Sequence, residues 1–292
     1  MTRKERDNRK TDRAWENVYQ RLEKDGLLDH KEKNSIIPYG DMRRPPLWKI
    51  ISTTAAMLVF CIYLSTIYFN QTNKETDRNL LTRQNMETTT LATTLEDGSI
   101  VYLAGNAAIH YPEHFQADKR EISLQGNALF DIAGNRQRPF LIETEDTRIE
   151  VLGTAFNVKS DNTQPFELSV QRGMVKVTLK QSGQDVYVKA GETVTLSSRK
   201  LEVSETKDHG QFATYVRQIR FKDERLTDIL RIINLNTEDI RFQTTPELED
   251  RQLTVTFSDN SPESMAELIC FALNLKCTRD KNVITLHEDV DQ

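Results

Sequence analysis

The stretch RIEVLGTAFNVKS, residues 148–160, decides how the fold is read. Its glycine, Gly153, separates two runs in which apolar and polar residues alternate, the pattern of half-buried β-strands. A glycine in a phosphate-binding loop lies between a strand and a helix, with further glycines or a lysine close by. Gly153 stands alone and has a predicted strand on each side. We therefore interpret it as a bend in a β-structure and not as part of a catalytic loop.

The same order of strand, glycine and strand recurs along this part of the chain. It is found at four further glycines, which are Gly105, Gly126, Gly173 and Gly191. The alternation slips by one residue across Gly153, where Val151 is followed by Phe156, and such a slip needs a bulge or a bend. Recurrence every 20 residues or so is typical of stacked strand pairs. Residues 88–200 are therefore predicted to form a solenoid-like or sandwich-like all-β domain.

The C-terminal segment changes character, because strand-like runs now alternate with two helical patterns. A shift of 36 residues lays Phe221 on Phe257 and Ile233 on Ile269. We predict a duplicated strand–helix–strand unit, a small α+β domain over residues 216–287 that follows a linker at 201–215. Its sheet is expected to offer an edge strand to a partner protein.

Residues 47–69, LWKIISTTAAMLVFCIYLSTIYF, contain a single charged residue, Lys49. As a helix this run would be about 34 Å long, enough to cross a hydrocarbon core of about 30 Å. A cleaved signal peptide and a buried core helix are the alternatives, but 46 residues precede the run and its length is rare in soluble folds. The sequence thus predicts a single-pass membrane protein with an outer linker at residues 70–87.

The orientation follows from the charges beside this run. Arg43 and Arg44 precede it, so the positive-inside tendency places residues 1–46 in the cytoplasm and the C-terminal part outside. Residues 70–292 hold 26 Lys and Arg against 35 Asp and Glu. This acidic balance argues against direct nucleic-acid binding, which needs clustered basic residues.

Residues 1–46 contain one amphipathic helix pattern. Its apolar side chains follow the spacing i, i+3, i+4 and i+7 and share one face; they are Trp15, Val18, Tyr19 and Leu22. The segment is too short to bury this face in a core of its own. The apolar face could bind a partner protein or lie at the membrane interface, or the helix could be merely solvated. Mixed charges on the polar face favour the partner, so these four residues are candidate partner-binding residues.

The chain shows no pattern of catalysis, and we expect neither an enzyme nor a cofactor. His110 and His114 are separated by Pro112, so no helix presents them together as metal ligands. The acids Glu143, Glu145 and Asp146 are typical of an exposed turn. No nucleophile–base motif, nucleotide-binding loop or paired C-x-x-C is present.

Two cysteines, Cys270 and Cys277, fall in the last predicted helix and at the start of the following strand. They can pair in an oxidising compartment. However, Cys270 lies well around the helix from Met265 and Ile269, so two separate thiols are favoured over a disulfide.

Several motifs together resemble the outer-face domain of FecR-like anti-sigma factors. In chain order they are LEDGSIVYL, HYPEHF, REISLQGNALFDIA, RPFLIET and IEVLGTAFNV. The C-terminal unit is similar to the small domain that often follows in this family, which itself resembles the short N-terminal domains of secretins and TonB-dependent receptors. The chain departs from the family pattern at Asn127, where a Glu is usual, and in the turn LAGNAA.

The resemblance implies a signal relay across three compartments, in which this chain spans the bacterial inner membrane and its C-terminal part lies in the periplasm. The periplasmic signalling domain of an outer-membrane TonB-dependent receptor would contact the C-terminal unit. The cytoplasmic helix would then release or activate an extracytoplasmic-function sigma factor, often after a membrane protease has cut the regulator. The alternative is a membrane-anchored scaffold that binds the envelope or a glycan and has no sigma-factor role.

Overall fold

The protein is described from a computed structural model, which covers residues 20, 21, 24, 63, 65, 80–161 and 163–289. The chain divides into two compact units, residues 1–74 and 75–292. Within the covered residues, no helix combines the length and the apolar character that a membrane crossing requires. The predicted span at 47–69 lies outside them, apart from Tyr63 and Ser65, which are both helical and exposed.

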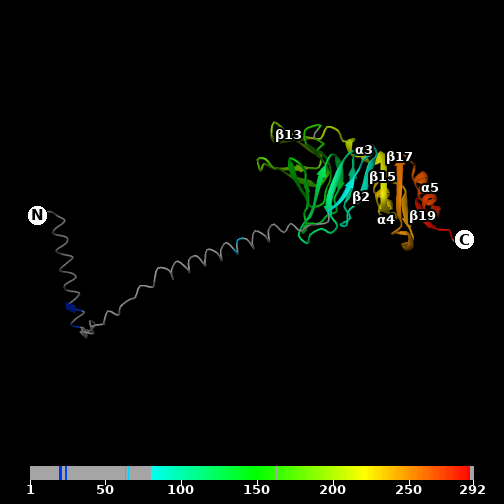
Figure 1. Cartoon of the computed structure of the whole chain (residues 1–292), viewed down its shortest axis with the longest axis horizontal. Coiled ribbons are helices and arrows are strands. Elements are labelled where there is room, and N and C mark those ends of the chain that lie inside the picture. The colour runs from blue at the N-terminus through cyan, green and yellow to red at the C-terminus, as the bar shows by residue number, and fades with distance from the viewer. Residues whose placement is uncertain are drawn as a thin grey trace. The chain divides into compact units, whose positions relative to one another are not determined.

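The second unit consists mainly of two packed β-sheets, with a few helices and a small third sheet (Figure 1). The seven-stranded sheet has the order β1 (Leu80–Gln84), β4 (Ala108–Pro112), β5 (Arg120–Gln125), β7 (Phe140–Glu143), β8 (Thr147–Val151), β11 (Met174–Leu179) and β12 (Asp185–Lys189). The nine-stranded sheet has the order β14 (Lys200–Glu205), β13 (Glu192–Ser197), β10 (Glu167–Arg172), β9 (Ala155–Lys159), β6 (Ala128–Asp131), β3 (Ile100–Leu103), β2 (Thr90–Thr94), β15 (Gln218–Arg225) and β17 (Gln252–Ser258).

The five predicted strand–glycine–strand segments are the places where the chain passes from one sheet to the other. The crossings are β3 to β4 at Gly105, β5 to β6 at Gly126, β8 to β9 at Gly153, β10 to β11 at Gly173, and β12 to β13 at Gly191. The strands of each pair therefore face each other across the core and are not partners in one hairpin. The prediction of an all-β domain is confirmed, and of its two forms the sandwich is the observed one.

The main core lies between these two sheets and explains the alternation in the sequence. Val101, Ile109 and Val177 are fully buried in it, as are the rings of Phe130 and Phe156, which stack with centroids 5.3 Å apart. Val151 before the Gly153 corner belongs to the same core as Phe156 after it. The one-residue slip in the sequence is thus the mark of a corner at which both strands keep their apolar faces inward.

The duplicated unit is present at the C-terminus. Its first copy is β15, α4 (Leu226–Asn236) and β16 (Arg241–Thr244), and its second is β17, α5 (Pro262–Leu273) and β18 (Leu275–Asp280). Asp223 and Asp259, which are 36 residues apart, both have positive φ, at 53° and 50°. Matching backbone strain at matching positions supports the internal repeat. Ser261 caps α5, because its side chain accepts a hydrogen bond from the Ser264 backbone amide.

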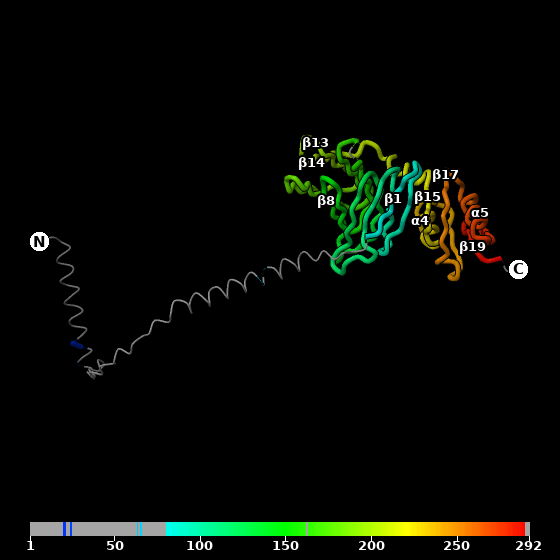
Figure 2. Tube along the Cα trace, in the orientation of Figure 1, coloured from blue at the N-terminus to red at the C-terminus, as the bar shows by residue number. Residues whose placement is uncertain are grey.

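The four strands of the repeat are divided between two sheets. β15 pairs in parallel with β2 of the sandwich and β17 pairs with β15, whereas β16 and β18 flank β19 (Val283–Glu288) in the three-stranded sheet. Figure 2 shows β15 and β17 continuing the sandwich toward α4 and β19. A second core joins Ala92, Tyr102 and Leu129 of the sandwich to the helices and small sheet of the repeat. Burying this apolar outer face is the physical reason for the shared sheet.

The segments expected as linkers contain regular structure. Residues 201–215 hold most of β14 and the beginning of α3 (Gln211–Arg217), and residues 70–87 include β1, which pairs with β4. A short 3₁₀ turn, η1 (Pro246–Leu248), completes the regular elements of the described part. Polar composition concealed these elements, since β1 and most of β14 expose their side chains.

Candidate functional site

The four candidate partner-binding residues, Trp15, Val18, Tyr19 and Leu22, lie outside the described residues. Their neighbours Gln20, Arg21 and Lys24 are helical and exposed. The role of the four apolar side chains stays a prediction.

The motif residues of the sandwich meet in a buried ion pair. The Arg120 guanidinium donates through Nη1 to Asp97 Oδ2 at 2.7 Å, and its side chain is 1% exposed. The Asp97 carboxylate also accepts hydrogen bonds from the amide and the hydroxyl of Ser99, at 3.0 and 2.7 Å. In return, Ser99 Oγ accepts a hydrogen bond from the Ala133 amide at 3.1 Å. The segments LEDGS and REISL are therefore joined by a buried ion pair, which has a structural role.

Arg120 has further partners that fix its position. Its Nε donates to the Arg138 carbonyl and its Nη1 to the Ala133 carbonyl, both at 2.9 Å. The guanidinium carbon lies 5.3 Å from the centroid of the Phe140 ring, a cation–π arrangement. Nη2 is buried and has no hydrogen-bond partner among the described residues. Arg138 and Phe140 come from the RPF motif, so this one side chain connects three motifs.

Helix α4 of the repeat lies against the same turn of the sandwich. Arg231 Nη1 donates to the Gly98 carbonyl at 2.8 Å, and Nη2 approaches Thr94 Oγ1 at 3.4 Å. Asp228 lies one turn earlier on the helix and is 3.6 Å from Arg231. The Asp97–Ser99 turn thus contacts Arg120 on one side and the repeat on the other. A displacement of α4 would act directly on this turn.

A buried carboxylate marks the seam between β2 and β15. Glu224 is 7% exposed and accepts a hydrogen bond from the Thr93 hydroxyl at 2.6 Å. A register shift between Phe221 and Glu224 interrupts the pairing with β17. Burial raises the pKa of Glu224, and the hydrogen bond from Thr93 offsets this only in part. The seam therefore contains a group whose charge is unfavourable in the folded state.

Helix α3 binds the other end of the sandwich through a polar triad. The Tyr215 hydroxyl donates to Asn157 Oδ1 at 2.8 Å, and the side-chain Nδ2 of Asn157 donates to Gln211 Oε1 at 2.9 Å. All three side chains are buried, and burial raises the pKa of Tyr215. Asn157 comes from the opening sequence stretch, so the FNV motif carries a contact to α3 on one face and Phe156 in the core on the other.

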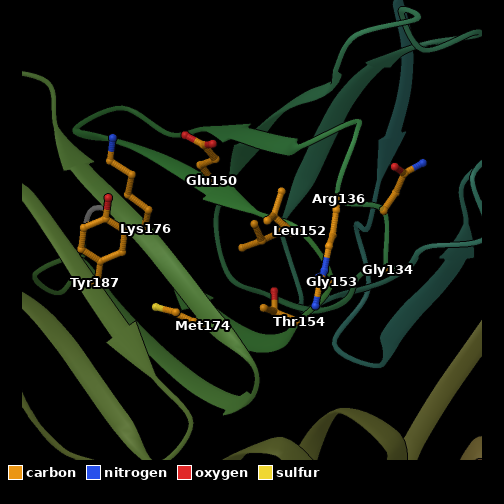
Figure 3. Close-up of a pocket in the computed structure, with 11 residues that line it drawn as sticks. Gly134, Arg136, Glu150, Leu152, Gly153, Thr154, Met174, Lys176 and Tyr187 are labelled. Atoms are coloured by element: carbon orange, nitrogen blue, oxygen red, sulfur yellow. The ribbon is translucent and has the colours of Figure 1, made fainter.

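Gly153 lies at a crowded corner beside an open groove of about 700 Å³ (Figure 3). A Cβ at Gly153 would meet the Cα of Gly134 at 2.6 Å, so the two backbones approach too closely for any side chain there. Leu152, Met174 and Tyr187 line the groove and are 45%, 51% and 61% exposed. The glycine is structural, and the apolar side chains beside it are exposed on a surface.

A second exposed apolar surface lies on α5. Phe271 is 88% exposed and Leu268, one turn earlier, is 40% exposed, whereas Ile269 is fully buried. Helical spacing puts Met265, Leu268 and Ile269 on one side of α5, yet only Ile269 of these is fully buried. The part of α5 that neighbouring strands cover is therefore narrower than its apolar stripe. Helical periodicity predicts the face of a helix but not how far a neighbouring sheet extends beneath it.

Cys270 and Cys277 form a disulfide, which corrects the preference for two separate thiols. The Cα atoms are 6.4 Å apart. The chain reverses at Asn274, which has left-handed backbone and caps α5, so the start of β18 returns beside the last turn of the helix. The sequence pattern correctly predicted that Cys270 lies in the last helix. It could not show the tight reversal at Asn274 that brings Cys277 back to it.

The remaining candidate groups are not assembled into a reactive centre. His110 bonds to Thr82 and His114 to Glu96, so the structure does not bring the two rings together at one site. Within the part of the chain that the structure covers, no cluster of three or more His, Cys, Asp or Glu fits a metal ion. Glu143 is paired with Arg148 and Lys180. Although burial works to raise its pKa, these two hydrogen-bonded cations lower it overall.

Part of the sandwich matches a known protein family. Residues 84–176 match the family model described as FecR protein. Two crystal structures of a candidate anti-sigma factor from Parabacteroides distasonis ATCC 8503, at 2.50 and 1.65 Å resolution, are 19% identical to the chain. Each covers 72% of this chain and 99% of its own, with a TM-score of 0.44. No curated protein matches the chain.

The matched range runs from the end of β1 into β11 and contains Asp97, Arg120 and Gly153. This part of the sandwich is therefore a FecR domain, and the resemblance noted in the sequence is confirmed.

Proposed function

We propose that the chain is an inner-membrane anti-sigma factor that relays a signal from a TonB-dependent outer-membrane receptor to an extracytoplasmic-function sigma factor. The observation that carries the proposal is the FecR domain at residues 84–176, with a C-terminal repeat docked on its Asp97–Ser99 turn. The predicted membrane span and the basic residues before it support an arrangement with residues 1–46 in the cytoplasm.

The cytoplasmic function is assigned to the amphipathic segment. Trp15, Val18, Tyr19 and Leu22 are predicted from the sequence to share one helix face, which a sigma factor would bury in the manner of a helix bound in a groove. Burial of one large apolar side chain contributes roughly 1.5–3 kcal/mol. Four such residues are enough for a specific complex between a short helix and a folded partner.

The periplasmic function is assigned to the repeat. Phe271 and Leu268 on α5 form an exposed apolar pair, and exposed aromatic side chains are common anchors of protein interfaces. We assign this pair to the contact with the receptor's signalling domain. Helix α4 then connects the repeat to the sandwich through Arg231 and the Gly98 carbonyl. A membrane protease that cuts the regulator is a further partner in this scheme.

Co-purification tests the function. Residues 1–46 fused to an affinity tag should retain an extracytoplasmic-function sigma factor from the same cell, and the Trp15→Ala/Tyr19→Ala variant should lose it. If the tagged segment retains none of the cell's sigma factors, the anti-sigma function is wrong and the scaffold alternative gains support.

The receptor contact has its own test. Phe271→Asp should weaken binding of the purified receptor signalling domain at least tenfold. Leu235→Asp is a matched control, because Leu235 is 58% exposed on α4 and lies outside the proposed contact. Equal binding by both variants would remove α5 from the interface.

A further inference from the structure

Strand β12, with the sequence DVYVK, forms one edge of the seven-stranded sheet. Among the described residues it pairs only with β11. An edge strand with unpaired backbone groups is a template for another strand, and proteins usually cover or guard it. Here the middle of the edge carries Tyr187, which is 61% exposed, beside Met174 at 51%. Figure 3 shows Tyr187 and Lys176 side by side on neighbouring strands, with Met174 next to them.

The backbone of β12 is directed so that a second strand can add to it. The Ala190 amide donates to the Gly173 carbonyl at 3.0 Å, and the Leu179 amide donates to the Gln184 carbonyl at 2.8 Å. Hydrogen-bonded pairs alternate along an antiparallel ladder. Every second residue of β12 therefore directs its N–H and C=O groups away from β11. These residues are Asp185, Tyr187 and Lys189.

The open part of the edge is short and has defined ends. Before it, the Gln184 side chain exchanges two hydrogen bonds with the backbone of Leu201 on β14, at 3.1 and 3.0 Å, and closes the sandwich there. After it, the outward amide of Lys189 donates to Glu192 Oε2 at 2.8 Å. The outward backbone groups left free are thus those of Asp185 and Tyr187 and the carbonyl of Lys189, which fixes both the length and the position of any added strand.

We propose that β12 is a homodimer interface, at which it pairs antiparallel with β12 of a second copy around a twofold axis at Tyr187. In this register Asp185 of each copy faces Lys189 of the other, and Tyr187 faces its symmetry mate. Opposite charges and aromatic pairs are the favourable cross-strand combinations. Registers centred on Asp185 or on Lys189 would instead place like charges opposite each other. The charge pattern of the strand therefore selects a second copy and a single register.

The neighbouring side chains hold Asp185 ready for this contact. Its carboxylate accepts a hydrogen bond from the Thr178 hydroxyl at 2.6 Å and lies 3.0 Å from Lys176 Nζ, both on β11. It is thus fixed on the outer face, where the Lys189 ammonium of the second copy would arrive. Pairing also covers part of the exposed Tyr187 and Met174 surface. Such an isologous contact closes as a dimer, because each copy uses its own edge only once.

Site-directed cross-linking of the full chain tests this register. Cys61→Ser first removes the one cysteine of the chain that is outside the Cys270–Cys277 disulfide. In this background, Tyr187→Cys gives the dimer two thiols on residues whose Cα atoms would be about 5.5 Å apart, within the range of a disulfide. Mild oxidation should convert most of the protein to a covalent dimer. Leu235→Cys is the matched control, with 58% exposure on α4, and should stay monomeric.

A charge reversal tests the complementarity. Lys189→Glu places a carboxylate opposite Asp185 of the second copy, so the dimer fraction in sedimentation and the cross-linking yield of Tyr187→Cys should fall at least fivefold. Both altered side chains are exposed, and circular dichroism checks the fold. Cross-linking at 187 no greater than at 235, a yield unaffected by Lys189→Glu, or capture of a different protein at 187 would each overturn the proposal.

Discussion

At the scale of single residues, the buried side chain of Arg120 connects three motifs of the sandwich. Its guanidinium and the Asp97 carboxylate are both at least nine-tenths buried and form an ion pair. Removing one partner of a buried ion pair leaves an uncompensated charge and costs about 3–5 kcal/mol. Arg120→Met should therefore lower the free energy of unfolding by about this amount, measured by urea denaturation.

Two further variants give this measurement its control. Arg172 pairs with Asp131 at 2.7 Å on the exposed surface, so Arg172→Met should cost less than about 1 kcal/mol. Adding Asp97→Asn to Arg120→Met removes the stranded charge and should recover part of the loss. A loss of under 1 kcal/mol for Arg120→Met would mean that the motif network does not hold the domain.

Glu224 predicts a pH dependence at the seam between sandwich and repeat. Its pKa is raised in the folded protein, chiefly by burial, so the folded state binds the proton more tightly than the unfolded state. The contribution to stability is full below the unfolded pKa of about 4.3 and is lost as the pH rises through the raised folded pKa. Glu224→Gln keeps an acceptor for the Thr93 hydroxyl and carries no charge.

The Glu224→Gln variant should accordingly melt at a higher temperature than the parent at pH 8, and the gap should close toward pH 4. Calorimetry across this range measures it, with the exposed Glu202→Gln as the control that changes little. A constant gap would show that the pKa of Glu224 is not raised on folding, and a gap that widens toward acid pH would show that the carboxylate is stabilised at the seam.

The corner at Gly153 has no room for a side chain. Gly153→Val adds a Cβ at 2.6 Å from the Gly134 Cα and needs a positive φ of 155°, so it should destabilise by about 2 kcal/mol or more and expose the domain to proteolysis. Gly134→Ala is the matched control, because a Cβ there meets no atom within 4 Å. If Gly153→Val resists protease like the parent yet loses signalling, Gly153 is a contact residue.

At the scale of elements, the disulfide connects the end of α5 to the start of β18. A loop of this length contributes about 2 kcal/mol in the chain-entropy description. Cys270→Ser or Cys277→Ser should lower the unfolding free energy of the oxidised protein by this amount. Reduction of the parent protein should have the same effect, and a parent whose stability is indifferent to reductant would contradict it.

The elements also show where sequence patterns suffice. Alternation and the glycines predicted the strands of the sandwich, because burial of one face imposes a period of two residues. The 36-residue repeat was visible because both copies bury equivalent apolar residues. The parallel pairing of β15 with β2 was not visible, since backbone hydrogen bonds between distant strands leave no local pattern. Nor was the exposure of Leu268, which depends on where the small sheet ends.

At the scale of the whole molecule, the FecR domain and the repeat share one sheet and one core, so they act as a single periplasmic body in the proposed relay. The sequence predicted that an all-β domain precedes a strand–helix repeat, because the apolar pattern changes from alternation to helical spacing. It could not predict that Arg231 and Glu224 fasten them together, because each residue has an ordinary sequence context. In the candidate site, motif residues were found by resemblance, but their buried network was found only by geometry.

Titration calorimetry of the full chain with the cognate sigma factor measures the binding that we propose for the N-terminal stripe. Loss of two large apolar contacts at roughly 1.5–3 kcal/mol each predicts that Trp15→Ala/Tyr19→Ala raises Kd by about 10²–10⁴-fold. Arg21→Ala/Lys24→Ala, on exposed helical positions, should change Kd by less than about fivefold. A Kd that Trp15→Ala/Tyr19→Ala leaves unchanged would show that the N-terminal stripe does not bind the sigma factor.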